Sequence, residues 1–175
     1  MEPMILRVQS ILRTTPPRWI SLAGTVPAEL LRRVPAPGEW SAIDCLAHLV
    51  DTERAVFPAR VAHLLRGEDI PDFDPGRQGT APGRAPGPQE LAAEFDRMRR
   101  ESVALLARLA AADLQRKGRH RELGTVTMGE LMHHWAGHDL MHTVQAERAI
   151  LQPFIEGCGP WKPSYSDHVA GTRGR

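Results

Sequence analysis

The 175 residues of the sequence fit one domain with a single core and are too few for two domains of ordinary size. A hydrophobic content of 42% supports a packed core, and the 25% of charged residues predict a mixed, solvated surface. The formal net charge is +1, and basic residues are scattered among acidic ones, so we expect neither a nucleic-acid partner nor an anionic membrane partner.

The two cysteines, Cys45 and Cys158, are too few for a disulfide framework, and neither belongs to a CxxC pair, which favours a reducing compartment. The first residues show neither the basic nor the apolar region of a signal peptide. No stretch approaches the ~18 apolar residues that span a bilayer. These features predict a cytoplasmic protein.

Helical periodicity is clear in several places along the chain, whereas strand signals are weak. A first helix is predicted over about residues 4–24, with a kink or restart at Pro16 and Pro17, because proline has no backbone N–H to donate. A short helical turn over 28–33 is predicted after Pro27.

A second helix is predicted from a capping pattern, in which the Ser41 side chain accepts from the backbone N–H of Asp44. This helix is predicted to run to Arg66 and to end at Gly67. The segment 67–88 is dense in proline and glycine and predicts a long loop, which is either functional or plain slack.

A third helix is predicted from Pro88 to Ala111, followed by a polar connector over 112–126. Thr127 and Glu130 form a capping box that opens a fourth helix, predicted to end near Leu151.

Four long helices joined in this way predict an all-α four-helix bundle in residues 1–153. Residues 154–175 are predicted to form a C-terminal extension that is partly disordered, above all over 171–175.

Histidines are concentrated in the fourth predicted helix, which holds four of the eight. At 100° per residue, His138 and His142 lie four residues apart on its apolar face, and Asp139 also points toward that face. His133 falls on the other side, and His134 lies at the edge.

Imidazoles that face a core need partners, and a divalent metal ion satisfies them directly. The alternative is two partly buried histidines that hydrogen-bond to carbonyls or acids.

A third ligand has to come from another helix, and His48, in the second predicted helix, is the natural candidate. The alternative for His48 is a surface histidine in contact with Asp44, four residues earlier. The remaining histidines, His63, His120 and His168, have no helical partner and are expected to face solvent.

Two segments together resemble the DinB/YfiT-like superfamily: WSAIDCLAHL over residues 40–49, and GTVTMGELMHHWAGHDLMHTVQ over residues 124–145. The family pattern is a Trp-Ser that opens a helix, a His-Leu farther along it, and a final helix with HxxxH. The resemblance covers about residues 4–151. The Pro16-Pro17 pair departs from it, since the family usually has a continuous first helix, and the tail after 153 has no counterpart.

The resemblance implies an up-down-down-up bundle in which His48, His138 and His142 bind a divalent metal ion, with His134 as the fallback ligand. Zinc or nickel is expected, with iron or manganese as alternatives. Three protein ligands leave a coordination position open, as in a working site. Such an ion lowers the pKa of a bound water or thiol.

Several polar residues are candidates for assisting the ion. Asp139 is the predicted catalytic residue, either orienting a ligand imidazole or acting as a base. Asp44 or Asp51 could do the same for His48, and Glu53 and Gln145 could contribute at the rim. Each acid could instead be a solvated charge or a helix-stabilising pair, which is the favoured interpretation of Asp51 and Glu53.

The resemblance implies a metal-dependent enzyme acting on small molecules, of thiol transferase or hydrolase type, with a low-molecular-weight thiol as a possible partner. The alternatives are a non-catalytic metal-binding or stress-response protein, and a helical scaffold whose histidines only form hydrogen bonds. A homodimer is also expected, because bundles of this family often pair.

Overall fold

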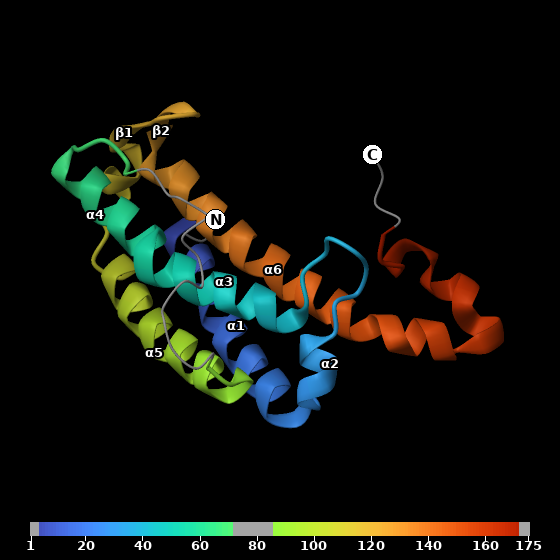
Figure 1. Ribbon diagram of the computed structural model, residues 1–175. Helices are drawn as coiled ribbons and strands as arrows, with labels where there is room; N and C mark the ends of the chain where they lie inside the picture. The colour runs from blue at the N-terminus through green and yellow to red at the C-terminus, as the bar shows by residue number, and fades with distance from the viewer. Residues whose placement is uncertain (1–3, 72–85, 172–175) are drawn as a thin grey trace.

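The computed structural model describes residues 4–71 and 86–171. Four helical segments pack into a bundle: α1 (Met4–Thr25), α3 (Ala42–Ala55) continued by α4 (Phe57–Arg66), α5 (Pro88–Leu106) and α6 (Met128–Gly157). Figure 1 shows α1 and α6 running in one direction while α3 and α5 run in the other. The predicted all-α, up-down-down-up bundle is therefore confirmed, and no helix of the described residues is long and apolar enough to cross a membrane.

The first helix is continuous through Pro16 and Pro17, so the restart predicted there is wrong. Pro16 cannot donate to the carbonyl of Leu12, four residues earlier. That carbonyl accepts instead from Nη1 of Arg99 on α5, at 3.1 Å. A tertiary hydrogen bond thus takes the place of the helical one. The predicted short turn is present as α2 (Ala28–Arg32).

The second predicted helix divides at Val56, where α3 ends and α4 begins. Pro58 explains the division, because it stands at the start of α4, where a missing N–H is tolerated. The capping box of Ser41 and Asp44 is present, and α4 ends at Gly67, which adopts the left-handed conformation. Both predicted ends are therefore confirmed.

The connector after α5 contains a hairpin that the sequence did not predict. Helix α5 ends at Leu106, earlier than predicted, and a 3-10 helix, η2 (Ala111–Gln115), follows. The strands β1 (Lys117–His120) and β2 (Gly124–Thr127) then pair antiparallel.

Close packing of the hairpin against the end of α4 explains why position 118 is a glycine. A Cβ at Gly118 would lie 2.7 Å from the carbonyl oxygen of Glu68 and 2.8 Å from Leu64, which is too close for any side chain.

Helix α6 is longer than predicted, because it continues through Pro153 to Gly157. The 3-10 segment η3 (Gly159–His168) follows, and Figure 1 shows it at the end of α6 beyond the bundle. Arg148 and Gln152 on α6 hold it by hydrogen bonds to the carbonyl oxygen of His168. The predicted division at residue 153 falls inside α6, and the predicted disorder over 171–175 falls largely outside the described residues.

The core consists of two apolar clusters with a polar layer between them. One cluster contains Trp19, Leu46 and Phe95, and the other contains Leu12, Phe57 and Trp135. Along each of the four helices, one buried polar residue lies between the two clusters: Thr15 on α1, Glu53 on α3, Arg99 on α5 and Asp139 on α6. This layer adjoins the predicted metal site.

Candidate metal centre

Three histidines from two helices converge at the side of the bundle. His48 comes from α3, and His138 and His142 come from successive turns of α6. One ring nitrogen of each lies within 4.8 Å of the others, and the Nε2 atoms of His48 and His138 are 3.0 Å apart. A tetrahedral ion with nitrogen ligands at 2.0–2.1 Å separates them by about 3.3 Å, so the triad needs only a small adjustment to hold one ion.

Burial keeps two of the three imidazoles neutral. Burial first, and then the charges of neighbouring histidines, lower the pKa of His138 to about 3 and that of His142 to about 4. The Gln145 hydrogen bond and the charge of Asp139 oppose part of the shift at His142. Neutral imidazole is the form that binds a metal ion, so these rings are ready as ligands near pH 7.

Two residues orient the ring of His142. Its Nδ1 lies 2.9 Å from Oε1 of Gln145, which accepts a hydrogen bond and leaves the lone pair on Nε2 for a ligand. The indole of Trp40, just before α3, stacks on the ring at a centroid distance of 5.5 Å and an interplanar angle of 18°. These contacts fix the plane and the tautomer of His142.

His138 carries an unsatisfied atom. Its Nδ1 is buried and has no hydrogen-bond partner among the described residues. Its Nε2 faces Nε2 of His48, and two lone pairs at 3.0 Å repel unless a proton or a cation lies between them. The donor set therefore fits a divalent ion.

A groove of about 600 Å³ lies between α6 and the residues just before α3, and no histidine is among the residues that line it. Trp40 and Gln145, which both contact His142, also line the groove. Met141 and Val144 give it an apolar floor, and its volume lies in the range typical of small-molecule sites.

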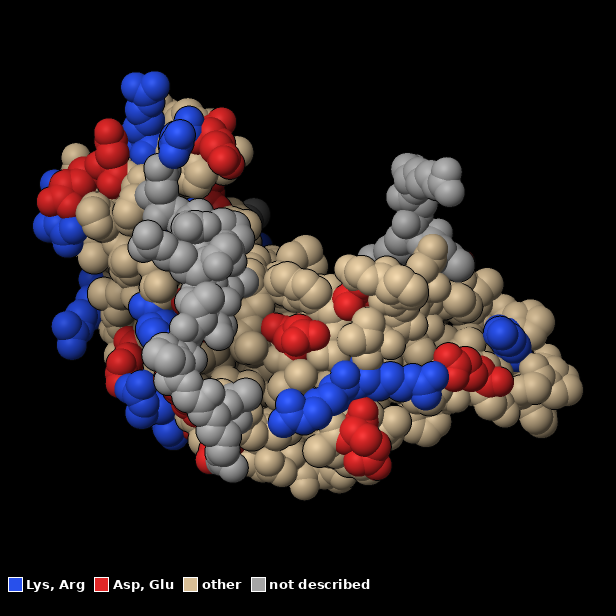
Figure 2. Space-filling view, in the orientation of Figure 1, with Lys and Arg blue, Asp and Glu red and all other residues tan. Residues whose placement is uncertain are grey.

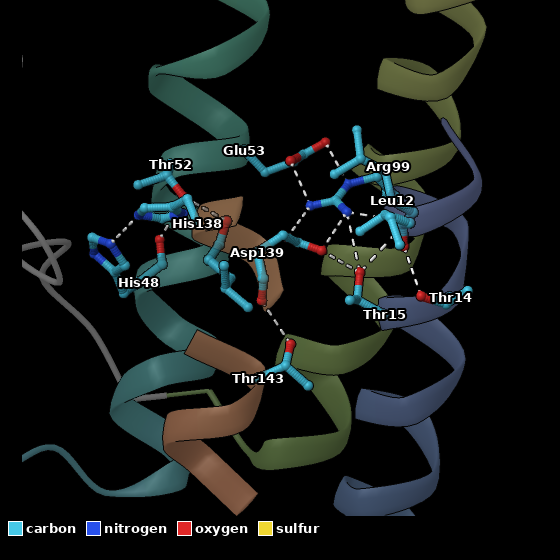
Figure 3. Close-up of polar contacts among 12 residues, drawn as sticks. Leu12, Thr14, Thr15, His48, Thr52, Glu53, Arg99, His138, Asp139 and Thr143 are labelled. Atoms are coloured by element: carbon cyan, nitrogen blue, oxygen red, sulfur yellow. Dashed lines mark hydrogen bonds and ion pairs between the residues drawn. The ribbon is translucent and has the colours of Figure 1, made fainter. Parts of the chain in front are cut away.

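Asp139 faces the polar layer and contacts none of the histidine rings by hydrogen bonds that the structure shows. Its Oδ1 and Oδ2 accept from Nη2 and Nη1 of Arg99, at 2.6 and 2.9 Å, and Oδ2 also accepts from the hydroxyl of Thr15. In Figure 3, Asp139 lies between the histidines and Arg99, with its carboxylate turned toward Arg99. The catalytic role predicted for it stays a prediction.

Arg99 completes the polar layer. Its Nε and Nη2 donate to the two carboxylate oxygens of Glu53, at 3.1 and 3.0 Å. Burial alone lowers the pKa of Arg99, but the charges and hydrogen bonds of Asp139 and Glu53 raise it well above its ordinary value. Glu53 is thus a buried ion-pair partner, and the predicted solvated charge or helix pair is wrong for this residue.

The other candidates are not part of the triad. Asp44 is exposed and caps α3 by accepting from Ser41, and Asp51 pairs with Arg54 on its own helix, as expected. His134, the fallback ligand, lies one turn before His138, with a ring-centroid distance of 5.7 Å.

Of the histidines expected to face solvent, His168 is exposed, whereas His63 and His120 are partly buried.

Residues 11–146 match the model of the DinB superfamily. This chain belongs to that superfamily. Among solved structures, this DinB protein is similar to YfiT from Bacillus subtilis, described as "a probable metal-dependent hydrolase with an unusual four-helix bundle topology". The match has a TM-score of 0.74 and 14% identity, and it covers 88% of this chain and 89% of that chain. At this identity the likeness shows the fold alone, and no curated protein matches the sequence.

Two features of this DinB protein escaped the sequence reasoning. Arg99 has the same helical spacing as the apolar residues Phe95 and Leu106, and an arginine on an apolar face is a usable signal of a buried ion pair. Trp40 belongs to the Trp-Ser motif, but the motif gave no sign that the indole would stack on His142.

Proposed function

We propose that this DinB protein is a metal-dependent enzyme that acts on small molecules by hydrolysis or thiol transfer, with His48, His138 and His142 as the ligands of one divalent ion. The observation that carries the proposal is the convergence of three imidazoles, two of them kept neutral by burial, close to a groove. Zinc or nickel suits three imidazoles best, and iron or manganese is the alternative. The likeness to YfiT, itself described as a probable metal-dependent hydrolase, supports the hydrolase type.

Residues around the triad orient the ring of His142 and form an apolar surface for the substrate. Gln145 holds the Nδ1 hydrogen of His142, and Trp40 covers the ring plane, so the lone pair on Nε2 keeps one direction. The apolar side chains of Met141 and Val144 place the body of a substrate along α6, next to the triad. When bound, the ion would lower the pKa of a water or thiol and so supply a nucleophile near neutral pH.

The first experiment measures metal content and activity together. Purified protein reconstituted with Zn²⁺ or Ni²⁺ is expected to hold one ion per chain, and His138→Ala is expected to lose it. Turnover of an activated ester, or conjugation of a small thiol to an electrophile, should fall at least about a hundredfold in the same variant. His168→Ala, at an exposed histidine outside the triad, is the matched control and should change neither quantity.

The outcomes separate the alternatives. Equal activity in the wild type and in His138→Ala would contradict catalysis through the ion. One ion per chain without turnover of either substrate type would favour the non-catalytic metal-binding protein. The small thiol partner and the homodimer stay predictions. Figure 2 shows basic and acidic residues interspersed on one face, and the expected lack of a nucleic-acid partner stays a prediction.

A further inference from the structure

The groove between α6 and the residues just before α3 has an exposed apolar lining. Met141 and Val144 on α6 are 55% and 53% exposed, and the side chain of Trp40 is 37% exposed. Isolated exposed apolar residues are common, but three around one groove form a surface that apolar ligand atoms can cover. The volume of about 600 Å³ accommodates a small molecule.

The two charged residues of the lining, Glu39 and Arg148, are occupied within the chain. Oε1 of Glu39 accepts from the backbone N–H of Gly171 at 2.7 Å, and Oε2 lies 3.7 Å from Nη1 of Arg148. Nε and Nη2 of Arg148 donate to the carbonyl oxygens of His168 and Val169, and the side chain of Arg148 is 10% exposed. The acid and the base thus face each other, and neither is an unpaired charge for a ligand.

A charged ligand would therefore lose water in the groove without gaining a counter-charge. Removing an ionic group from water is costly unless an opposite charge compensates it, whereas an uncharged ring gains free energy when its apolar surface is buried. The indole of Trp40 offers a flat surface against which another aromatic ring can pack. The lining therefore favours an uncharged ligand with an apolar, planar part.

Gln145 leaves one polar group of the lining for the ligand. Its Oε1 lies 2.9 Å from Nδ1 of His142, whereas its amide nitrogen forms no hydrogen bond with a described residue. That nitrogen can donate to an acceptor, and a carbonyl oxygen is an acceptor without a charge. Because the same side chain contacts His142, an acceptor bound to Gln145 would lie beside the triad.

We propose that the groove binds uncharged esters or amides. Their apolar part, best an aromatic ring, packs on Trp40, Met141 and Val144, and their carbonyl oxygen accepts from the amide of Gln145. Small acids and amines are excluded as good ligands, because the charges of Glu39 and Arg148 are already paired. The inference rests on the proposed function and names its class of substrate.

The experiment titrates metal-free protein with three probes of one size and different charge: benzamide, which is uncharged, benzoate, which is negative, and benzamidine, which is positive. The indole N–H resonance of Trp40 is followed by NMR. Benzamide is expected to shift it saturably, and each charged probe should bind at least about tenfold more weakly. No saturation with benzamide would overturn the inference, as would equal or tighter binding of either charged probe.

Variants on α6 test where the probe lies. Met141→Ala removes part of the apolar lining and should weaken the binding of benzamide about three- to tenfold. Phe154→Ala removes a larger side chain that is 59% exposed on the same helix but lies outside the groove lining, and it should change the affinity less than about twofold. Equal losses in the two variants would contradict binding in the groove.

The role of Gln145 has its own test. Gln145→Leu should weaken the binding of benzamide about fivefold, as expected for the loss of one hydrogen bond between uncharged groups. Unchanged binding would overturn the assignment of the carbonyl oxygen to Gln145.

These measurements need neither the ion nor turnover, so they separate this inference from the proposed function. Selective binding of benzamide without ester hydrolysis by the zinc-loaded protein would support the ligand class and contradict the enzyme. Metal-dependent hydrolysis without any preference among the three probes would support the enzyme and overturn the ligand class.

Discussion

His138 and Asp139 are neighbours on α6, yet they belong to regions of opposite character. Asp139 joins Arg99, Glu53 and Thr15 in a layer where each residue is at most 2% exposed and hydrogen-bonded within the layer. His138 joins a partly exposed triad whose nitrogens face one another and in which its own Nδ1 lacks a partner among the described residues. The residues of the ionic layer satisfy one another's hydrogen-bonding groups, whereas the triad leaves Nδ1 of His138 unsatisfied among the described residues.

The difference indicates which region serves stability and which serves binding. A buried ionic layer with every donor used has nothing left to offer a ligand, whereas three ring nitrogens that converge on one point can take a cation. The charges of the layer act on the two histidines of α6 in opposite directions. The charge of Asp139 opposes the lowering of the pKa of His142 by burial, whereas the charge of Arg99 adds to the lowering of the pKa of His138.

We expect the largest change in stability when the arginine of the ionic layer is replaced. Arg99→Met leaves the carboxylates of Glu53 and Asp139 buried without their shared cation, which should lower the free energy of unfolding by about 3–5 kcal/mol. Urea unfolding measures the change. Arg97→Met on the same helix breaks an exposed pair with Glu101 and should cost less than about 1 kcal/mol. Similar losses in both variants would show that the layer contributes no more than a surface pair.

We expect the next largest change in stability when a metal ion binds the histidine triad. Zn²⁺ at a hundred times its dissociation constant should raise the free energy of unfolding by about 2.7 kcal/mol, because the ion binds only the folded triad. His142→Ala should abolish the increase, whereas His133→Ala, an exposed histidine on the same helix, should keep it. Urea unfolding with and without Zn²⁺ measures both. An equal increase in the two variants would place the ion elsewhere.

The two regions also differ in how far the sequence could predict them. The triad could be predicted because its ligands are rare residue types at recurring spacings: an HxxxH pair on one helix and a histidine in the capped helix that begins at Ser41. The ionic layer could not, because its four members come from four helices, and only packing brings Arg99 to the carbonyl that Pro16 leaves free. Periodicity treats Asp139 and Glu53 alike, as acids near a helix face.

The ends and interruptions of the helices show the same limit of prediction from sequence. The caps at Ser41, Thr127 and Gly67 are local and were predicted, since each depends on residues within one turn. Pro16 and Pro153 were expected to interrupt or follow a helix but lie inside one, because tertiary contacts outweigh a lost backbone hydrogen bond. The hairpin over 117–127 was missed because its strands are short and polar and depend on packing against α4.

A third prediction tests whether the hydrogen bond that orients the ring of His142 contributes to metal binding. Gln145→Leu removes the acceptor from Nδ1 of His142 while leaving the three ligands in place. The affinity for Zn²⁺ should fall by about 10- to 100-fold, with little change in the stability of the metal-free protein. Competition with a chromophoric chelator measures the affinity. Gln89→Leu, at an exposed position on α5, is the control, and a matching loss there would rule out a specific role for Gln145.

The smallest effect is expected at Cys45, which lies in the core one turn before His48. Burial, and then the charge of Asp44, raises the pKa of this thiol to about 12, so about one molecule in 10,000 carries the thiolate at pH 8. Folded protein should therefore react with a thiol reagent at Cys158 only, and urea should expose both thiols. Treatment with a chelator should leave this pattern unchanged, because removing an ion from the edge of the bundle opens no path through Leu46 and Leu49. Rapid labelling of Cys45 after chelation would mean that the triad holds the core closed, and the separation between a stabilising layer and a binding site would fail.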